Sequence, residues 1–175
     1  MGLLAGAFIT AAVLLTVGGL AKLRDPLPLV RAMRALRLPL SPFVVRSFAA
    51  AETTIGGAAV VNGSRLLAAA VAASYLAFSV FVLVALLRGG ALSSCGCFGR
   101  VDTPATRLHV AVTAGLAAVA VAVAVRPTAS ARELLAGHPG DGAALLATSA
   151  ALTAVVYLAL AVHPRLVAVR LTSRP

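Results

Sequence analysis

The two cysteines of the chain are separated by a single residue, in the sequence SSCGCFGRVDTP at positions 93–104. Cys95 and Cys97 can close a small, strained disulfide ring, and Gly96 between them permits the unusual backbone torsions that such a ring needs. Strained disulfides are reduced more easily than structural ones, which is typical of labile or catalytic pairs. The spacing therefore favours thiol–disulfide exchange with a partner thiol.

The residues around the cysteine pair are suited to support a reactive thiol. Arg100 and the N–H groups of the turn from Gly96 to Gly99 would stabilise a thiolate, which is the attacking species in thiol exchange. Phe98 is expected to anchor this loop at the bilayer surface. We therefore assign Cys95 and Cys97 the catalytic role and their neighbours a supporting one.

Two other interpretations of the cysteine pair remain open. Two thiolates are half of a soft-metal or persulfide site, which His109 or Asp102 would complete, but the second ligand pair of a structural zinc site is missing. Alternatively, the cysteines are small inert hydrophobic residues in a turn. His109, His138 and His163 stand at the edges of apolar segments, where we expect interfacial polar residues. We predict no bound metal.

One carboxylate stands inside an apolar segment. Glu52 lies in the middle of residues 43–61, a segment that also carries Arg46 near one end. An ionisable side chain at membrane depth costs about 2.5–3.5 kcal/mol on insertion scales, so it is expected to face the interior of a helix bundle. We assign Glu52 a catalytic role in proton transfer. The alternative is a protonated or hydrogen-bonded carboxyl that ties helices together.

The elements that must position these residues are membrane helices. Of the 175 residues, 61% are hydrophobic and only 11% are charged, whereas soluble domains are about half apolar and about a quarter charged. The mean hydropathy is +1.01. Tryptophan is absent and small apolar residues abound, which favours helices that pack closely. The fold class is therefore an all-α polytopic transmembrane bundle.

Five apolar segments are long enough to cross a bilayer. The predicted spans are residues 2–21, 43–61, 66–87, 108–125 and 143–162. The first has no basic segment before it, so we expect a retained helix rather than a cleaved signal. Residues 1–125 then form a four-helix membrane domain that includes the cysteine loop. Residues 126–175 add a polar connection, a fifth span and a basic tail.

The linker after the first span contains a short basic helix at residues 29–38, punctuated by prolines. Its arginines recur every three residues and so share one sector of the helix. The helix would lie at the membrane interface with these side chains among anionic headgroups, or would be a solvated connection. The residues assigned to the interface are Lys22, Arg24, Asp25, Arg31, Arg34 and Arg37.

The net charge of +10 has an explanation other than nucleic-acid binding. The basic residues lie between apolar spans rather than in one patch with interleaved aromatics, so we expect no nucleic-acid partner. Most of them fall in the first linker, the cysteine loop and the C-terminal tail. The positive-inside rule therefore predicts a cytoplasmic cysteine loop and an amino terminus on the outside.

Three motifs resemble the MauE family of membrane proteins, which is related to the DoxX-like group. They are GLAKLRDP at the end of the first span, a glutamate in AAAETTIGGAAV, and CGCFG between the third and fourth spans. The residues at the motif positions are Lys22, Asp25, Pro26, Glu52, Cys95, Cys97, Phe98 and Gly99. The resemblance covers about residues 1–125. The chain departs from it by reading Arg107 and Leu108, where relatives often have arginine and asparagine, and by its fifth span.

The resemblance implies a redox role in a bacterial cytoplasmic membrane. MauE is associated with maturation of the disulfide-rich small subunit of methylamine dehydrogenase, beside a thioredoxin-like partner. We therefore expect a membrane redox protein that exchanges electrons with a thioredoxin-like protein, with a quinone as the candidate electron acceptor. A cytoplasmic cysteine loop would serve an exported enzyme only if electrons cross the membrane. The alternative is a non-enzymatic scaffold or transport component with structural or metal-binding cysteines.

Overall fold

The computed structural model describes residues 2–88, 106–137 and 139–161 of the chain. Within those residues it is all helical and contains no strand. Its helices are α1 (Gly2–Arg24), α2 (Leu27–Ala35), α3 (Pro42–Val61), α4 (Arg65–Leu87), α5 (Arg107–Val125), α6 (Ala131–Gly137) and α7 (Pro139–Ala161). Helices α1, α3, α4, α5 and α7 are long and apolar enough to cross a membrane. The prediction of an all-α polytopic bundle with five spans is confirmed.

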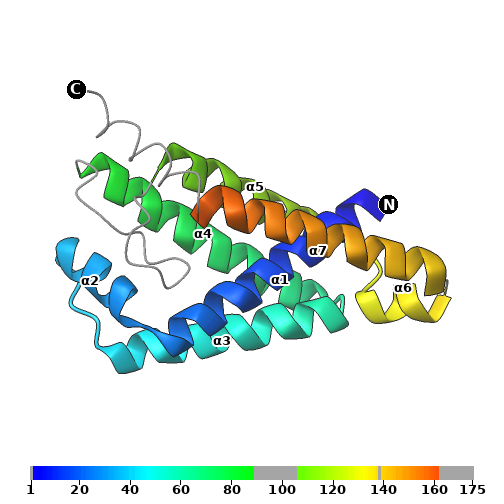
Figure 1. Ribbon diagram of the computed structural model, residues 1–175, viewed down its shortest axis with the longest axis horizontal. Coiled ribbons are helices and arrows are strands. Elements are labelled where there is room, and N and C mark those ends of the chain that lie inside the picture. The colour runs from blue at the N-terminus through cyan, green and yellow to red at the C-terminus, as the bar shows by residue number, and fades with distance from the viewer. Residues whose placement is uncertain (1, 89–105, 138, 162–175) are drawn as a thin grey trace.

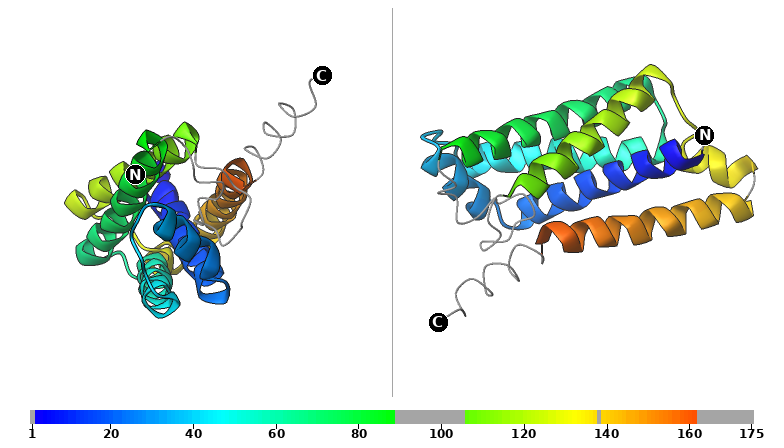
Figure 2. Two further views of the ribbon diagram at one scale, coloured as in Figure 1. Left: turned by 90° about the vertical axis from the view of Figure 1, so that its left-hand side faces the viewer. Right: turned by 90° about the horizontal axis from the view of Figure 1, so that it is seen from above.

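Helix α1 lies at the centre of the bundle. It contacts α3, α4, α5 and α7 (Figure 1), and Figure 2 shows it between α7 and the pair formed by α4 and α5. Of its most apolar stretch, 61% is buried, more than in any of the other four spans. The core around it is built largely from alanines, because helices in lipid associate through close van der Waals packing of small residues.

Helices α1 and α3 approach each other at two glycines. A Cβ on Gly56 would lie 2.6 Å from the main-chain oxygen of Ala12, and a Cβ on Gly19 would lie 2.8 Å from that of Ala49. Any larger residue at these positions would force the backbones apart. This contact fixes the end of α1 against the middle of α3.

We expect Gly56→Ala to lower the free energy of unfolding by about 1–3 kcal/mol, because the added methyl overpacks the contact between α1 and α3. Gly57→Ala is the matched control, since a Cβ on Gly57 would have no neighbouring atom within 4 Å. Thermal unfolding of the detergent-solubilised protein measures both variants. Equal stability of the two variants would argue against the close approach of these helices.

Helix α2 lies across one end of the bundle. Ala32 and Leu36 are buried against Ala85 of α4, and Nη1 of Arg88 donates a hydrogen bond to the carbonyl of Leu36 (3.0 Å). The segment that follows α1 is therefore held against the end of α4. Figure 1 shows α2 at the end of the bundle where α1 and α4 finish.

The basic helix of the linker differs in extent from the prediction. Helix α2 ends at Ala35, and Arg37 has a left-handed φ of 61°, so the third arginine of the series lies beyond the helix. The side chains of Arg31, Arg34 and Arg37 are all exposed. One side of α2 thus packs on the bundle while its arginines face outward.

The connection before the last span contains a helix that sequence analysis did not predict. Ser130 and Glu133 form a capping box at the start of α6: the N–H and hydroxyl of Ser130 donate to Glu133 Oε2 (2.8 and 3.0 Å), and the N–H of Glu133 donates to Ser130 Oγ (3.3 Å). The backbone hydrogen bond from Ser130, and then that from its hydroxyl, lower the pKa of the Glu133 carboxyl. Helix α7 then begins four residues before the predicted fifth span.

Helix α7 packs along α1. The contact is close at Gly6, where a Cβ would lie 3.1 Å from a methyl of Leu145. The hydroxyl of Ser149 donates to the carbonyl of Gly6 (3.2 Å), which joins the two helices by a polar contact. The fifth span is therefore an integral part of the bundle.

Candidate functional site

A buried ion pair joins the end of α1 to the middle of α3. Lys22 Nζ pairs with Oε2 of Glu52, and the two side chains are 2% and 15% exposed. Sequence analysis placed Lys22 at the membrane interface, but the structure buries it, because the Glu52 carboxylate gives its ammonium a partner inside the bundle. Glu52 faces inward, as expected for an ionisable residue at this depth.

The Lys22 ammonium keeps unused hydrogen-bonding capacity. It lies 4.1 Å from the ring centroid of Phe78 on α4, a distance suited to a cation–π interaction. Apart from the ion pair itself, neither Lys22 Nζ nor Glu52 Oε2 has a hydrogen-bond partner in the described part of the chain. Since an ammonium carries three donors, the pair can still bind a water or a ligand.

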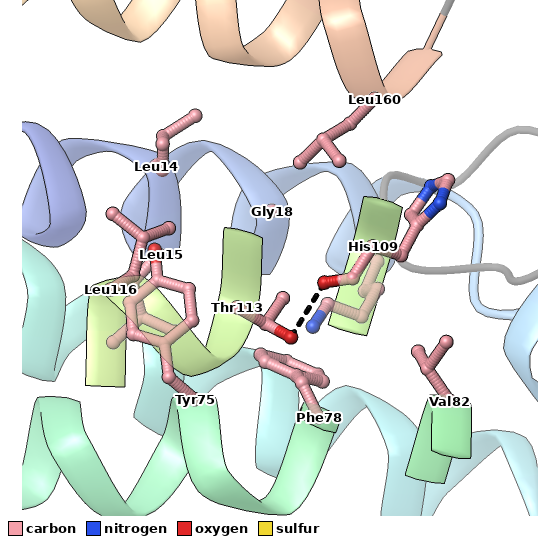
Figure 3. Close-up of a pocket in the computed structure, with 11 residues that line it drawn as sticks. Leu14, Leu15, Gly18, Tyr75, Phe78, Val82, His109, Thr113, Leu116 and Leu160 are labelled. Carbon is pink, nitrogen blue, oxygen red and sulfur yellow. Dashed lines mark hydrogen bonds between the residues drawn. The ribbon is translucent and has the colours of Figure 1, made fainter. Parts of the chain in front are cut away.

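A small cavity lies on the Lys22 side of the pair, between α1, α4, α5 and α7 (Figure 3). Its volume of about 30 Å³ holds a water molecule. Its polar lining residues are Lys22, Tyr75, His109 and Thr113, and Leu160 of α7 closes it from the other side. A water here would satisfy donors that Lys22 does not use in the ion pair.

A row of polar groups runs from this cavity to the start of α5. The hydroxyls of Ser79 and Thr113 lie 2.8 Å apart, Thr113 donates to the carbonyl of His109 (2.7 Å), and His109 Nδ1 lies 2.9 Å from Thr106 Oγ1. His109 was expected at the interface, but it is only 2% exposed. Its ring lies beneath α7, whose Leu160 lines the same cavity (Figure 3).

A larger cavity lies on the Glu52 side of the pair, between α2, α3 and α4. Its volume is about 270 Å³. The residues that line it are Leu29, Met33, Leu40, Val45, Phe48, Glu52, Ala77, Phe78 and Phe81. Among the described residues that line it, Glu52 is the one that carries a charge. Because Phe78 lines both cavities, the ion pair and this ring stand between them.

Two further residues of the GLAKLRDP motif shape the linker. Asp25 Oδ1 accepts a hydrogen bond from the N–H of Leu27 (3.1 Å), which helps to start α2. The side chains of Arg24 and Asp25 are exposed. Within one motif, Lys22 therefore enters the bundle while its neighbours stay at the surface and turn the chain.

The cysteine segment itself falls outside the described residues. That applies to Cys95, Gly96, Cys97, Phe98, Gly99, Arg100 and Asp102, and also to His138 and His163. The described positions on either side of the segment are Arg88, which contacts Leu36, and Thr106, which contacts His109. Lys22 and His109 line the same cavity. The chain therefore leaves and re-enters the bundle at the end that holds the ion pair.

No group of three or more His, Cys, Asp or Glu side chains that could hold a metal ion occurs in residues 2–88, 106–137 and 139–161. The chemistry of the described site thus centres on one carboxylate, one ammonium and two cavities. Such a site can bind or pass a proton, or hold a small ligand between the ion pair and the aromatic wall.

The bundle and its buried charges define the class: the chain is a polytopic integral membrane protein with five spans. It belongs to the MauE family, since the model of "Methylamine utilisation protein MauE" matches residues 1–126. The match contains Lys22, Glu52 and both cysteines and ends after α5, so α6 and α7 lie beyond it. No curated protein and no solved structure matches the chain.

Proposed function

We propose that this MauE-family protein is a membrane component of thiol–disulfide exchange, in which Cys95 and Cys97 cycle between dithiol and disulfide. One observation supports it above the others: the Cys-Gly-Cys segment lies within the family match, and its flanking helices meet the end of the bundle that holds a buried Lys22–Glu52 pair. A cysteine pair in a segment that connects two helices at this end of the bundle suits chemistry that moves electrons and protons together.

The exchange partner is a thioredoxin-like protein. A thiolate of the reduced partner attacks the Cys95–Cys97 disulfide and forms a mixed disulfide, and the partner's second thiol then resolves it. The partner leaves oxidised and this chain keeps two thiols. In the methylamine-utilisation setting, the oxidised partner would support disulfide formation in another protein.

Glu52 is the proton-handling group in this proposal. Oxidation of a dithiol to a disulfide releases two electrons and two protons, and the electrons pass to a further carrier. Glu52 is ion-paired but 15% exposed toward the larger cavity, so its carboxylate can take up a proton and release it again. Lys22 holds the carboxylate in place during this step.

A scaffold or transport component is the second candidate function. The observation that favours it is the outward-facing set of arginines on and after α2, which could dock an acidic partner. Under this hypothesis, the double change of Cys95→Ser and Cys97→Ser leaves function intact. Glu52→Gln, or loss of the α2 arginines, would then abolish function instead.

The orientation of the cysteine segment is tested by labelling Cys95 and Cys97 in intact cells with a membrane-impermeant maleimide, with and without prior reduction. The distribution of basic residues predicts labelling only after the cells are permeabilised, and more labelling after reduction. Labelling of intact cells after reduction would overturn this orientation and place the disulfide on the outside. Labelling that reduction never increases would favour the scaffold.

A further inference from the structure

We propose that the larger cavity, between α2, α3 and α4, binds the ring of a lipid-soluble quinone with Glu52 against one of the ring oxygens. The inference rests on the proposed thiol–disulfide function, because a dithiol that is oxidised in the membrane needs an electron acceptor. It adds to that function the chemical class of the electron acceptor, a quinone, and its binding site in the bundle.

The shape and lining of the cavity suit a flat aromatic head group. Three phenylalanines line it, Phe48 from α3 and Phe78 and Phe81 from α4. A volume of about 270 Å³ lies just below the range of about 300–1,000 Å³ typical of whole small-molecule sites. The cavity therefore has room for a ring but not for a long isoprenoid tail, which would remain in the bilayer.

The outer wall of the cavity faces lipid. Phe48 lines the cavity and is nevertheless 65% exposed, and Ala77 on the facing helix is also exposed. Both residues lie within membrane-spanning helices, so their exposed faces contact acyl chains. A molecule that enters between them must come from the bilayer, which requires a lipid-soluble ligand.

The inner wall of the cavity offers a carboxylate that an acyl chain could not satisfy. Glu52 lines it, and Lys22, which pairs with Glu52, has donors without a hydrogen-bond partner among the described residues. A quinol hydroxyl can donate to the Glu52 carboxylate, and a quinone carbonyl can accept from the same carboxyl once it is protonated. An acyl chain would leave this desolvated charge pair without further partners.

Oxidation of the Cys95–Cys97 dithiol by a quinone is balanced in electrons and protons. The two thiols of Cys95 and Cys97 and one quinone give one disulfide and one quinol, so two electrons and two protons pass from sulfur to the ring oxygens. Glu52 would carry protons to the ring, and Lys22 would stabilise the carboxylate after each transfer. No other reactant is required.

The test measures binding of decylubiquinone to the purified full chain in quinone-free lipid nanodiscs by isothermal titration calorimetry. Ala77→Phe places a ring in the mouth of the cavity and is expected to weaken binding at least about tenfold, or 1.4 kcal/mol. Ala73→Phe is the matched control: the same change one turn away on α4, at an exposed position outside the cavity lining. It should leave the affinity unchanged within about twofold.

A second pair of variants tests the same site in case Ala77→Phe does not fold. Phe48→Leu removes an aromatic wall at a largely exposed position and is expected to weaken binding, whereas Phe43→Leu, at a side chain 78% exposed and outside the cavity lining, is not. No binding by the unaltered chain would overturn the inference. So would equal effects within each pair, or a co-purified phospholipid that decylubiquinone does not displace.

The quinone site and the thiol–disulfide function can fail separately. The double variant with Cys95→Ser and Cys97→Ser is expected to bind decylubiquinone like the unaltered chain, because none of the described residues that line the cavity is a cysteine. Binding without any thiol redox change would refute the proposed function and leave the cavity assignment standing. A thiol cycle without quinone binding would do the reverse.

Discussion

Glu52→Gln is expected to lower the free energy of unfolding by about 3–5 kcal/mol, because it leaves the Lys22 ammonium buried without a counter-charge. The side chain of Lys22 is 2% exposed, so one water in the small cavity cannot supply the counter-charge that the carboxylate gave. Lys22→Met should destabilise in the same way by leaving Glu52 unpaired. Denaturant or thermal unfolding in detergent, followed by circular dichroism, measures both changes.

The double variant with Lys22→Met and Glu52→Met is expected to regain most of the lost stability, because replacing both charges with apolar groups removes the desolvation penalty together with the pair. Arg24→Met is the control on the same helix, since Arg24 is exposed and should change stability by less than about 0.5 kcal/mol. A double variant as unstable as the worse single variant would contradict the buried pair.

Replacing either Cys95 or Cys97 by serine is expected to abolish turnover with a reduced thioredoxin-like protein while the chain still inserts normally. The reason is that one cysteine must be attacked and the other must leave. When only the partner's resolving cysteine is replaced, its remaining thiolate attacks the disulfide of the unaltered chain, and the mixed disulfide should accumulate because the partner has no second thiol to resolve it. Neither single variant has a disulfide to be attacked, so neither should form this adduct. Non-reducing gels of membranes incubated with the partner detect this adduct.

The control for the cysteine variants is Ser74→Ala, a conservative change on α4 far in sequence from the cysteines, where the hydroxyl only donates to the carbonyl of Ala70 (2.9 Å). It should retain full exchange activity. Full turnover by both single cysteine variants would instead support the scaffold hypothesis, in which the thiols carry no electrons.

The five spans could be predicted from the sequence because each is a long apolar run. Their ends could not be predicted as well. Helix α1 continues past the apolar run to Lys22 and Arg24, because the Lys22 ammonium has a counter-charge in Glu52 and the Arg24 side chain is exposed at the surface. Similarly, α6 was missed although Ser130 and Glu133 have the spacing of a capping box.

The partner of Glu52 could not be read from the sequence. Lys22 stands thirty positions earlier, and only the approach of α1 to α3 at Gly19 and Gly56 brings the two charges together. The available signal was one cation and one anion on consecutive antiparallel spans. His109 was misplaced for a related reason, because its burial depends on α7, whose position against α5 no local pattern reveals.

The redox roles of Cys95 and Cys97, of the supporting residues around them, and of the quinone stay predictions. They are supported by residue spacing and by membership of the MauE family. The Lys22–Glu52 pair is a site where a proton could bind, and the two cavities are sites where a water or a ligand could bind. The family match and the described structure establish a five-span membrane protein of the MauE family, and experiments on its thiols test the redox role.

The most direct test is a redox titration of Cys95 and Cys97 in isolated membranes poised with mixtures of reduced and oxidised glutathione, with free thiols counted by the mass shift of a maleimide reagent. Both thiols are expected to disappear together in one reversible two-electron transition, which Ser replacement of either cysteine eliminates. If both thiols remain free at every ratio of oxidised to reduced glutathione, Cys95 and Cys97 do not form a dithiol–disulfide couple, and the proposed thiol–disulfide exchange is wrong.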